Sequence, residues 1–204
     1  MMQKRKNHWE TVYRTKNPDE VSWTQDVPKT SLELIKAINL DKSAKIIDVG
    51  GGDGKLVDFL LNEGFENITV LDISGKAIER AQSRLGDKAR KVTWIECDIT
   101  DFHPEERYDV WHDRAAFHFL TEENQIQAYV KLAEKAVLDY LILGTFSENG
   151  PKKCSGLDIK QYNEVQMAET FQNFTKISCR TLDHITPFGT KQNFTFCSFK
   201  RMGG

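Results

Sequence analysis

The sequence lacks the features on which metal-binding proteins depend. Its four cysteines are widely spaced, with no C-x-x-C pair and no histidine close by at metal-ligand spacing. A zinc site is therefore not expected, and no metal site is predicted. Cys97, Cys179 and Cys197 lie in strand-like runs, where a cysteine usually behaves as a small buried hydrophobic residue.

Long apolar runs and an excess of basic charge are also missing. No stretch approaches the length of a membrane span, and the basic residues 1–8 are not followed by the apolar segment of a secretory signal. The net charge is −2, which gives no overall basic field for nucleic acid. We therefore expect a cytoplasmic, monomeric protein with no membrane partner and no nucleic-acid partner.

Strand-like and helix-like segments alternate along the 204 residues. Strands are predicted at 45–49, 68–72, 92–96, 108–112 and 138–146, and a closing hairpin at 175–182 and 194–201. Alternation of this kind predicts an α/β fold: a doubly wound, mostly parallel seven-stranded sheet with a C-terminal antiparallel hairpin and helices on both faces. We expect one domain over 1–204, with an N-terminal arm at 1–29 and the core at 30–204.

Three residues are predicted to begin helices. Ser74 and Thr121 are expected N-caps, and Thr30 opens a Thr-Ser-Leu-Glu pattern typical of a capping box. A further helix is expected around 162–174, after a polar loop at 147–156.

The most informative segment is 46–54, which reads Ile-Ile-Asp-Val-Gly-Gly-Gly-Asp-Gly. A strand followed by glycines and then a helix suits a nucleotide-like cofactor, because ligand atoms can approach a backbone without β-carbons beside a helix N-terminus. A dinucleotide fingerprint starting at Gly50 and Gly52 needs its third glycine at position 55, which is Lys55. The third glycine is Gly54, so the pattern is G-x-G-x-G.

That spacing, with Asp48 just upstream, resembles motif I of the class I S-adenosylmethionine (SAM)-dependent methyltransferases. The resemblance spans residues 30–201, although the family's Pro-Gly-Gly before strand five is absent. It implies SAM as the cofactor, with the second strand's acid on the ribose hydroxyls and the third strand's acid on the adenine amine. The implied cofactor-binding residues of the core are Asp48, Gly50, Gly52, Gly54, Asp72, Ile73, Asp98 and Ile99.

Simpler roles stay open for the acids. Asp48 is expected either in a structural role or near the methionine ammonium of the cofactor. Asp53 could cap the following helix, and Asp98 could be a turn acid satisfied by neighbouring backbone.

The N-terminal arm carries aromatic residues in a polar stretch. Such residues, if exposed, suggest docking onto another molecule. The pattern Trp9-x-x-x-Tyr13, followed by Trp23, is similar to lysine methyltransferases that act on translation elongation factors. This resemblance implies that the three aromatics cap bound SAM and that Arg114 also contacts it, with a cation–π rationale for the sulfonium. Hydrophobic stapling of the arm is the alternative.

Candidate catalytic residues follow the fourth strand. His112, Asp113 and His118 could position an acceptor or remove its proton, and His118 could equally be a packing residue. Cys154 could contact substrate or be a plain thiol. An Asn-Pro-Pro-Tyr motif, expected of enzymes that methylate amino groups in nucleic acids, is absent.

These observations predict a SAM-dependent methyltransferase that acts on an N, O or S atom of a small-molecule acceptor. A protein-lysine N-methyltransferase is the alternative, and a non-catalytic SAM-binding protein is the second alternative.

Overall fold

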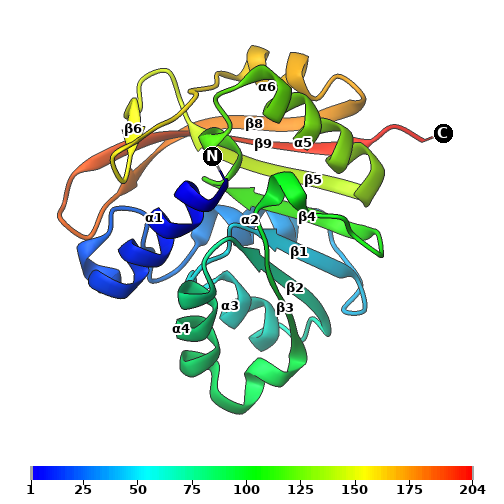
Figure 1. Cartoon of the computed structure of the whole chain (residues 1–204). Coiled ribbons are helices and arrows are strands. Elements are labelled where there is room, and N and C mark those ends of the chain that lie inside the picture. Colours follow the sequence, from blue (N-terminus) through cyan, green and yellow to red (C-terminus); the bar gives the residue numbers. More distant parts are fainter. Residues whose placement is uncertain (1, 204) are drawn as a thin grey trace.

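The sheet has seven strands in the order β3-β2-β1-β4-β5-β9-β8 (Figure 1). The computed structural model describes residues 2–203. The strands are β1 (Lys45–Val49), β2 (Asn67–Asp72), β3 (Val92–Glu96), β4 (Tyr108–Arg114), β5 (Val137–Phe146), β8 (Phe174–Ile185) and β9 (Lys191–Arg201). β1 to β5 are parallel, and β9 runs antiparallel between β5 and β8. The predicted fold class is confirmed.

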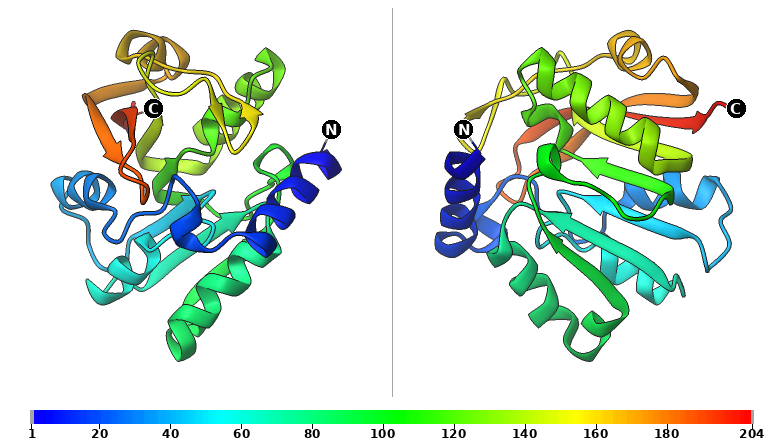
Figure 2. Two further views of the ribbon diagram at one scale, coloured as in Figure 1. Left: turned by 90° about the vertical axis from the view of Figure 1, so that its left-hand side faces the viewer. Right: turned by 45° about the vertical axis from the view of Figure 1, so that its right-hand side comes forward.

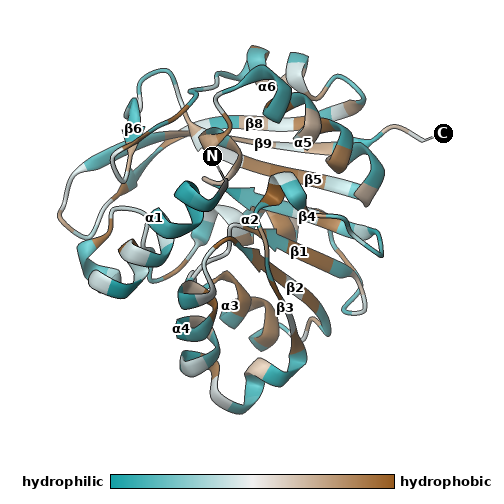
Figure 3. Cartoon of the chain, in the orientation of Figure 1, coloured by the Kyte–Doolittle hydropathy of each residue, from teal (hydrophilic) through white to brown (hydrophobic). Residues whose placement is uncertain are grey.

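Helices cover both faces of this sheet, and strands such as β1 and β2 are strongly apolar, whereas the edge strand β8 is mixed (Figure 3). α2 (Lys29–Ala37) and α3 (Leu56–Asn62) pack on Ile46 and Val110, together with the end of α4 (Gly75–Leu85). α5 (Glu123–Ala136) and α6 (Glu164–Thr170) pack on Ile47 and Trp111 from the other side. Successive strand residues point to opposite faces, so neighbours in the sequence are separated by the sheet.

The N-terminal arm contains a helix that the sequence analysis missed. α1 (Met2–Thr15) lies beside α4, outside the helix layers that cover the sheet (Figures 1 and 2). An ion pair between Lys6 and Glu96 and a hydrogen bond from Arg80 to the Lys16 carbonyl oxygen (2.7 Å) hold it there. A small hairpin, β6 (Lys153–Cys154) and β7 (Leu157–Asp158), lies where a loop was predicted.

Two of the three predicted helix caps are wrong. The Ser74 hydroxyl accepts from the Ala77 N–H at 3.2 Å, which confirms that cap. α2, however, begins at Lys29, so Thr30 lies inside its first turn. α5 begins after Glu122, which leaves Thr121 outside the helix.

The interpretation of Cys179 and Cys197 as separate buried thiols is also wrong. They lie directly opposite each other on β8 and β9 and form a disulfide. Only the pairing of these two strands could reveal this, because the cysteines are 18 residues apart. None of the helices in residues 2–203 combines the length and apolarity needed to cross a membrane.

Candidate active site

A cavity of about 230 Å³ lies at the carboxyl ends of β1 to β4, between the sheet and the N-terminal arm. In open parallel sheets, ligands bind at this edge. The predicted residues that line it are Trp9, Tyr13, Trp23, Asp48, Gly50, Gly54, Asp72, Ile73, Asp98, Ile99, His112 and Arg114. Gly52, Asp113 and His118 are not among its lining residues.

The glycines serve the packing of the loop itself. Gly50 and Gly52 have φ of +67° and +53°, a backbone conformation that favours glycine. A β-carbon on Gly52 would lie 2.5 Å from the Tyr13 hydroxyl, and one on Gly54 would lie 2.7 Å from the Gly51 carbonyl oxygen. Gly52 is thus covered by α1, and Gly51, which the sequence analysis missed, lines the cavity in its place.

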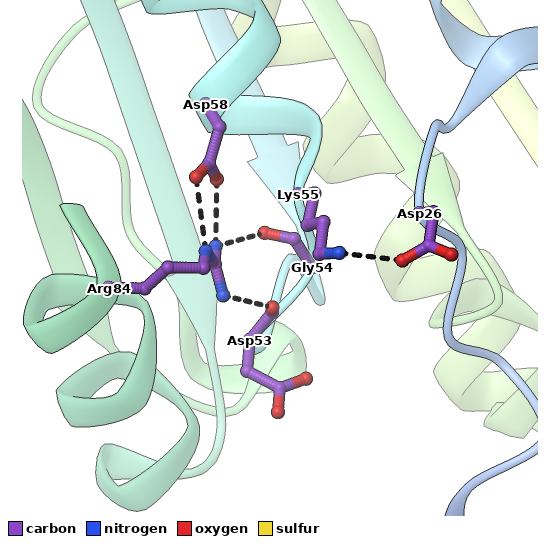
Figure 4. Close-up of polar contacts among 6 residues, drawn as sticks. All are labelled: Asp26, Asp53, Gly54, Lys55, Asp58 and Arg84. Carbon is purple, nitrogen blue, oxygen red and sulfur yellow. Dashed lines mark hydrogen bonds and ion pairs between the residues drawn. The ribbon is translucent and has the colours of Figure 1, made fainter. Parts of the chain in front are cut away.

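Arg84 fixes the glycine loop from α4 (Figure 4). Its guanidinium donates to the carbonyl oxygens of Asp53 (2.6 Å) and Gly54 (2.8 Å), and it forms two bonds to the Asp58 carboxylate (3.1 and 2.8 Å). On the other side of the loop, Lys55 pairs with Asp26 at 2.8 Å. The loop therefore keeps its shape through a residue that lies 30 positions further along the chain than Gly54.

Asp72 is buried at the end of β2. One of its carboxylate oxygens accepts from the Ser74 N–H at 2.8 Å. Burial, together with the nearby charges of Asp53 and Asp48, raises the pKa of Asp72 to about 7, and hydrogen bonds from the Ser74 and Gly52 backbone partly offset this rise. Asp53 in turn lies 3.4 Å from the Arg80 guanidinium. Asp72 is therefore a buried acid that faces the cavity.

Asp98 has more partners than the sequence indicated. It caps the short 3₁₀ helix Ile99–Asp101, where Oδ1 accepts from the N–H and the hydroxyl of Thr100 (3.1 and 2.9 Å). This matches the alternative role of a satisfied turn acid. Its Oδ2 also pairs with Arg5 of α1 at 2.8 Å. Asp98 lines the cavity as well, so Arg5 lies at the oxygen that the resemblance assigns to an adenine amine.

The arm aromatics are not exposed, contrary to expectation. Tyr13 is buried, while Trp9 and Trp23 are partly buried. The Trp9 ring lies 5.6 Å from that of Trp23 and 5.2 Å from that of Phe119, both edge-on. These side chains form one wall of the cavity. The same contacts hold the arm against the core and would cover a bound ligand.

His112 is held on both ring nitrogens. Nδ1 lies 2.7 Å from Asp48 Oδ1, and Nε2 lies 2.8 Å from the Ser31 hydroxyl of α2. In the neutral imidazole with its proton on Nδ1, that nitrogen donates to the Asp48 carboxylate and Nε2 accepts from the Ser31 hydroxyl. This is the arrangement of a base oriented by a carboxylate, and all three residues line the cavity.

Asp113 and His118 lie apart from this group. Asp113 points to the opposite face of β4, where it accepts from the Tyr129 hydroxyl at 2.7 Å and from the Ala116 N–H at 2.9 Å. His118 is fully buried, and burial lowers its pKa to about 3. The contacts of Asp113 suit a structural role, and neither Asp113 nor His118 lines the cavity.

Other lining residues could not be found in the sequence. Arg5, Arg84 and Phe119 belong to none of the sequence motifs, whereas Gly51 and Ser31 lie within motifs that assigned them no place in the cavity.

Comparison with known proteins agrees with this geometry. Residues 46–136 match the sequence profile of the family described as "Methyltransferase domain". A malonyl-[acyl-carrier protein] O-methyltransferase of Anoxybacillus flavithermus is 32% identical over 140 residues, which cover 64% of this chain and 52% of that protein. An eEF1A lysine and N-terminal methyltransferase of Mus musculus is 23% identical over 124 residues, 59% of this chain and 17% of that protein.

Solved structures share the fold. The N-methyltransferase NodS from Bradyrhizobium japonicum, in complex with S-adenosyl-L-homocysteine (SAH), superimposes with a TM-score of 0.71 at 16% identity. The match covers 97% of this chain and 100% of that one. The chain spans about half the length, or less, of the first curated relatives it matches.

Proposed function

Since residues 46–136 match the methyltransferase domain family, and the chain has the fold of class I SAM-dependent methyltransferases, we propose that the protein transfers a methyl group from SAM to an N, O or S atom of a small-molecule acceptor. The observation that carries the proposal is the cavity at the carboxyl ends of the parallel strands, where Asp72, Asp98 and the glycine loop meet. The same proposal describes a monomeric, single-domain, cytoplasmic enzyme whose N-terminal arm covers the ligands. It includes no membrane partner and no nucleic-acid partner.

The residues present fit this cofactor. Asp72 is buried at the cavity, and two ribose hydroxyls would add charge-assisted bonds to those that it accepts from the Ser74 and Gly52 backbone. Gly50, Gly51 and Gly54 leave backbone open at the cavity, and Ile73 and Ile99 offer apolar surface for a base. Asp98 would accept a hydrogen bond from the adenine amine if its Oδ2 accepted from Arg5 and the amine together, or if Arg5 moved away from Oδ2.

SAM, when bound, supplies a sulfonium-activated methyl group. The chain's own task is then to orient the acceptor and to take up its proton where the acceptor has one to lose. His112 suits this task, because its Nδ1 is fixed by Asp48 and its Nε2 is free to accept once the Ser31 hydroxyl turns away or relays the proton.

A small acceptor is supported by the shape of the site. The N-terminal arm and Cys154 of the β6–β7 hairpin line the cavity, and its volume of about 230 Å³ suits a small acceptor beside the cofactor. A protein lysine is the second candidate, favoured by the aromatic wall and by the name of the murine relative. A non-catalytic SAM-binding protein is the third.

Two measurements test the proposal. Calorimetry should detect binding of SAH and none of NAD, and the reverse result would reject the cofactor assignment. Methyl-labelled SAM, incubated with the protein and a lysate of its own organism, should then label the low-mass fraction. Label in a discrete protein band would establish the lysine alternative, whereas SAH binding without any transfer would establish the non-catalytic one.

A further inference from the structure

Arg114 lies in the wall of the cavity and forms no ion pair with any residue that the structure describes. Its Nη1 donates to the Trp23 carbonyl oxygen at 2.9 Å, and its guanidinium lies 5.2 Å from the centre of the Phe194 ring. Its Nη2 is buried and has no hydrogen-bond acceptor, and no ion pair within residues 2–203 includes this side chain. The indole N–H of Trp23 is near the Tyr13 hydroxyl but likewise lacks a well-formed hydrogen bond.

No neighbouring group balances this charge. Burial raises the pKa of the Cys154 thiol to about 12, so at neutral pH it is uncharged. The closest influential carboxylate, Asp48, acts on Arg114 only at longer range and is engaged by His112. Burial lowers the pKa of Arg114 to about 10, which leaves it cationic at neutral pH. An unpaired buried cation is costly, so a ligand anion is the expected partner.

Arg114 lies on the side of the cavity away from the nucleoside acids. It ends β4, whereas Asp72 ends β2, two strands to one side. The Phe194 ring under its guanidinium belongs to β9, two strands to the other side. The cation therefore faces the part of the cavity that remains once Asp72 and Asp98 have engaged a nucleoside.

We propose that Arg114 binds a carboxylate of the methyl acceptor, so that the acceptor is a small organic anion; this inference rests on the proposed function. His112 and Arg114 are two residues apart on β4 and project from the same face, with Cα atoms about 7 Å apart. In an acceptor that reaches both His112 and Arg114, the distance between the carboxylate and the nucleophilic atom is about the length of one aromatic ring. The rings of Trp23 and Phe119 suit such a flat body, and a lysine side chain would bring a second cation to Arg114.

Calorimetry on the SAH-saturated protein tests this, with 4-hydroxybenzoate as the probe and 4-hydroxybenzamide as its neutral match. The carboxylate should bind at least about tenfold more tightly than the amide, as expected of a hydrogen bond to a charged group. With SAH saturating in both proteins, the preference should fall below about twofold in Arg114→Met. Arg114→Lys should retain part of the preference, and thermal unfolding of both variants checks that they fold.

The other outcomes reject the inference in distinguishable ways. Equal binding of the two probes to the wild type removes the anion site. A tenfold loss of SAH affinity in Arg114→Met, with no change in the probe preference, assigns Arg114 to the methionine carboxylate of the cofactor instead. Absence of SAH binding to the wild type rejects the proposed function itself, and this inference with it.

Discussion

Replacing Asp72 by asparagine should move the stability of the protein and its cofactor affinity in opposite directions. The side chain is 5% exposed, and burial raises its pKa from 3.8 to about 7. A raised acid pKa means that the folded state disfavours the ionised form. The ionised Asp72 therefore lowers the stability of the protein without cofactor. We expect its benefit to lie in cofactor binding.

The sign and size of the stability effect follow from linkage. Below about pH 3.8 the acid is protonated in both states, and above about pH 7 it is ionised in both and the folded state bears the full penalty. Between these values the folded protein holds more protons, so stability falls as pH rises. At 1.36 kcal/mol per pKa unit the penalty reaches at most about 4 kcal/mol. Asp72→Asn should thus raise the free energy of unfolding by about 1–4 kcal/mol at pH 8 and hardly at all at pH 4.

Cofactor affinity should change the other way. Losing the charged acceptor for two ribose hydroxyls should weaken SAH binding by about 2 kcal/mol, roughly 30-fold. Urea unfolding at pH 4 and pH 8, with calorimetry at pH 8, measures both effects, and the exposed Asp139→Asn is the control that should change neither. If Asp72→Asn is less stable at pH 8 and binds SAH like the wild type, Asp72 is a structural acid and the ribose assignment is lost.

Four further substitutions test the loop and the base, with Gly86→Ala as the control for Gly52→Ala. Arg84→Met removes the hydrogen bonds to the carbonyl oxygens of the glycine loop. It should lower the free energy of unfolding, measured in urea, by about 1–3 kcal/mol and weaken SAH binding, measured by calorimetry, about tenfold. Unchanged SAH affinity would mean that the loop keeps its shape without Arg84. Gly52→Ala and Gly86→Ala share nearly the same φ (+53° and +57°), but only the first places a β-carbon against Tyr13. Gly86→Ala should cost about 1–2 kcal/mol, and Gly52→Ala should cost more and also weaken SAH binding; equal losses in the two variants would contradict the role given to α1. His112→Gln should slow methyl transfer by about 10²–10⁴-fold and flatten the acidic limb of the pH–rate profile, with SAH affinity unchanged. If weaker SAH binding explained the whole loss of rate, His112 would not be a base.

Local patterns predicted the strands well, because each strand is a short apolar run bounded by polar residues. β3 (Val92–Glu96) is found as predicted, and β1 and the Ser74 cap are also correct. α1 was missed because its polar sequence has no strong apolar face, and its helical form depends on packing against α4 and the cavity. The caps at Thr30 and Thr121 were wrong because tertiary packing, and not the side-chain oxygen, set where those helices begin.

The sequence by itself determined the α/β fold and the place of the glycine loop, since strand periodicity and glycine spacing are local properties of the chain. It also named Asp72, Asp98 and His112 as residues of one sheet edge, because parallel strands bring their carboxyl ends together. Only the tertiary structure decided what each residue meets there: Arg5 on Asp98, Ser31 and Asp48 on His112, and no counter-ion at Arg114. These partners come from distant parts of the chain, and burial, charge and hydrogen-bond satisfaction belong to the folded protein alone.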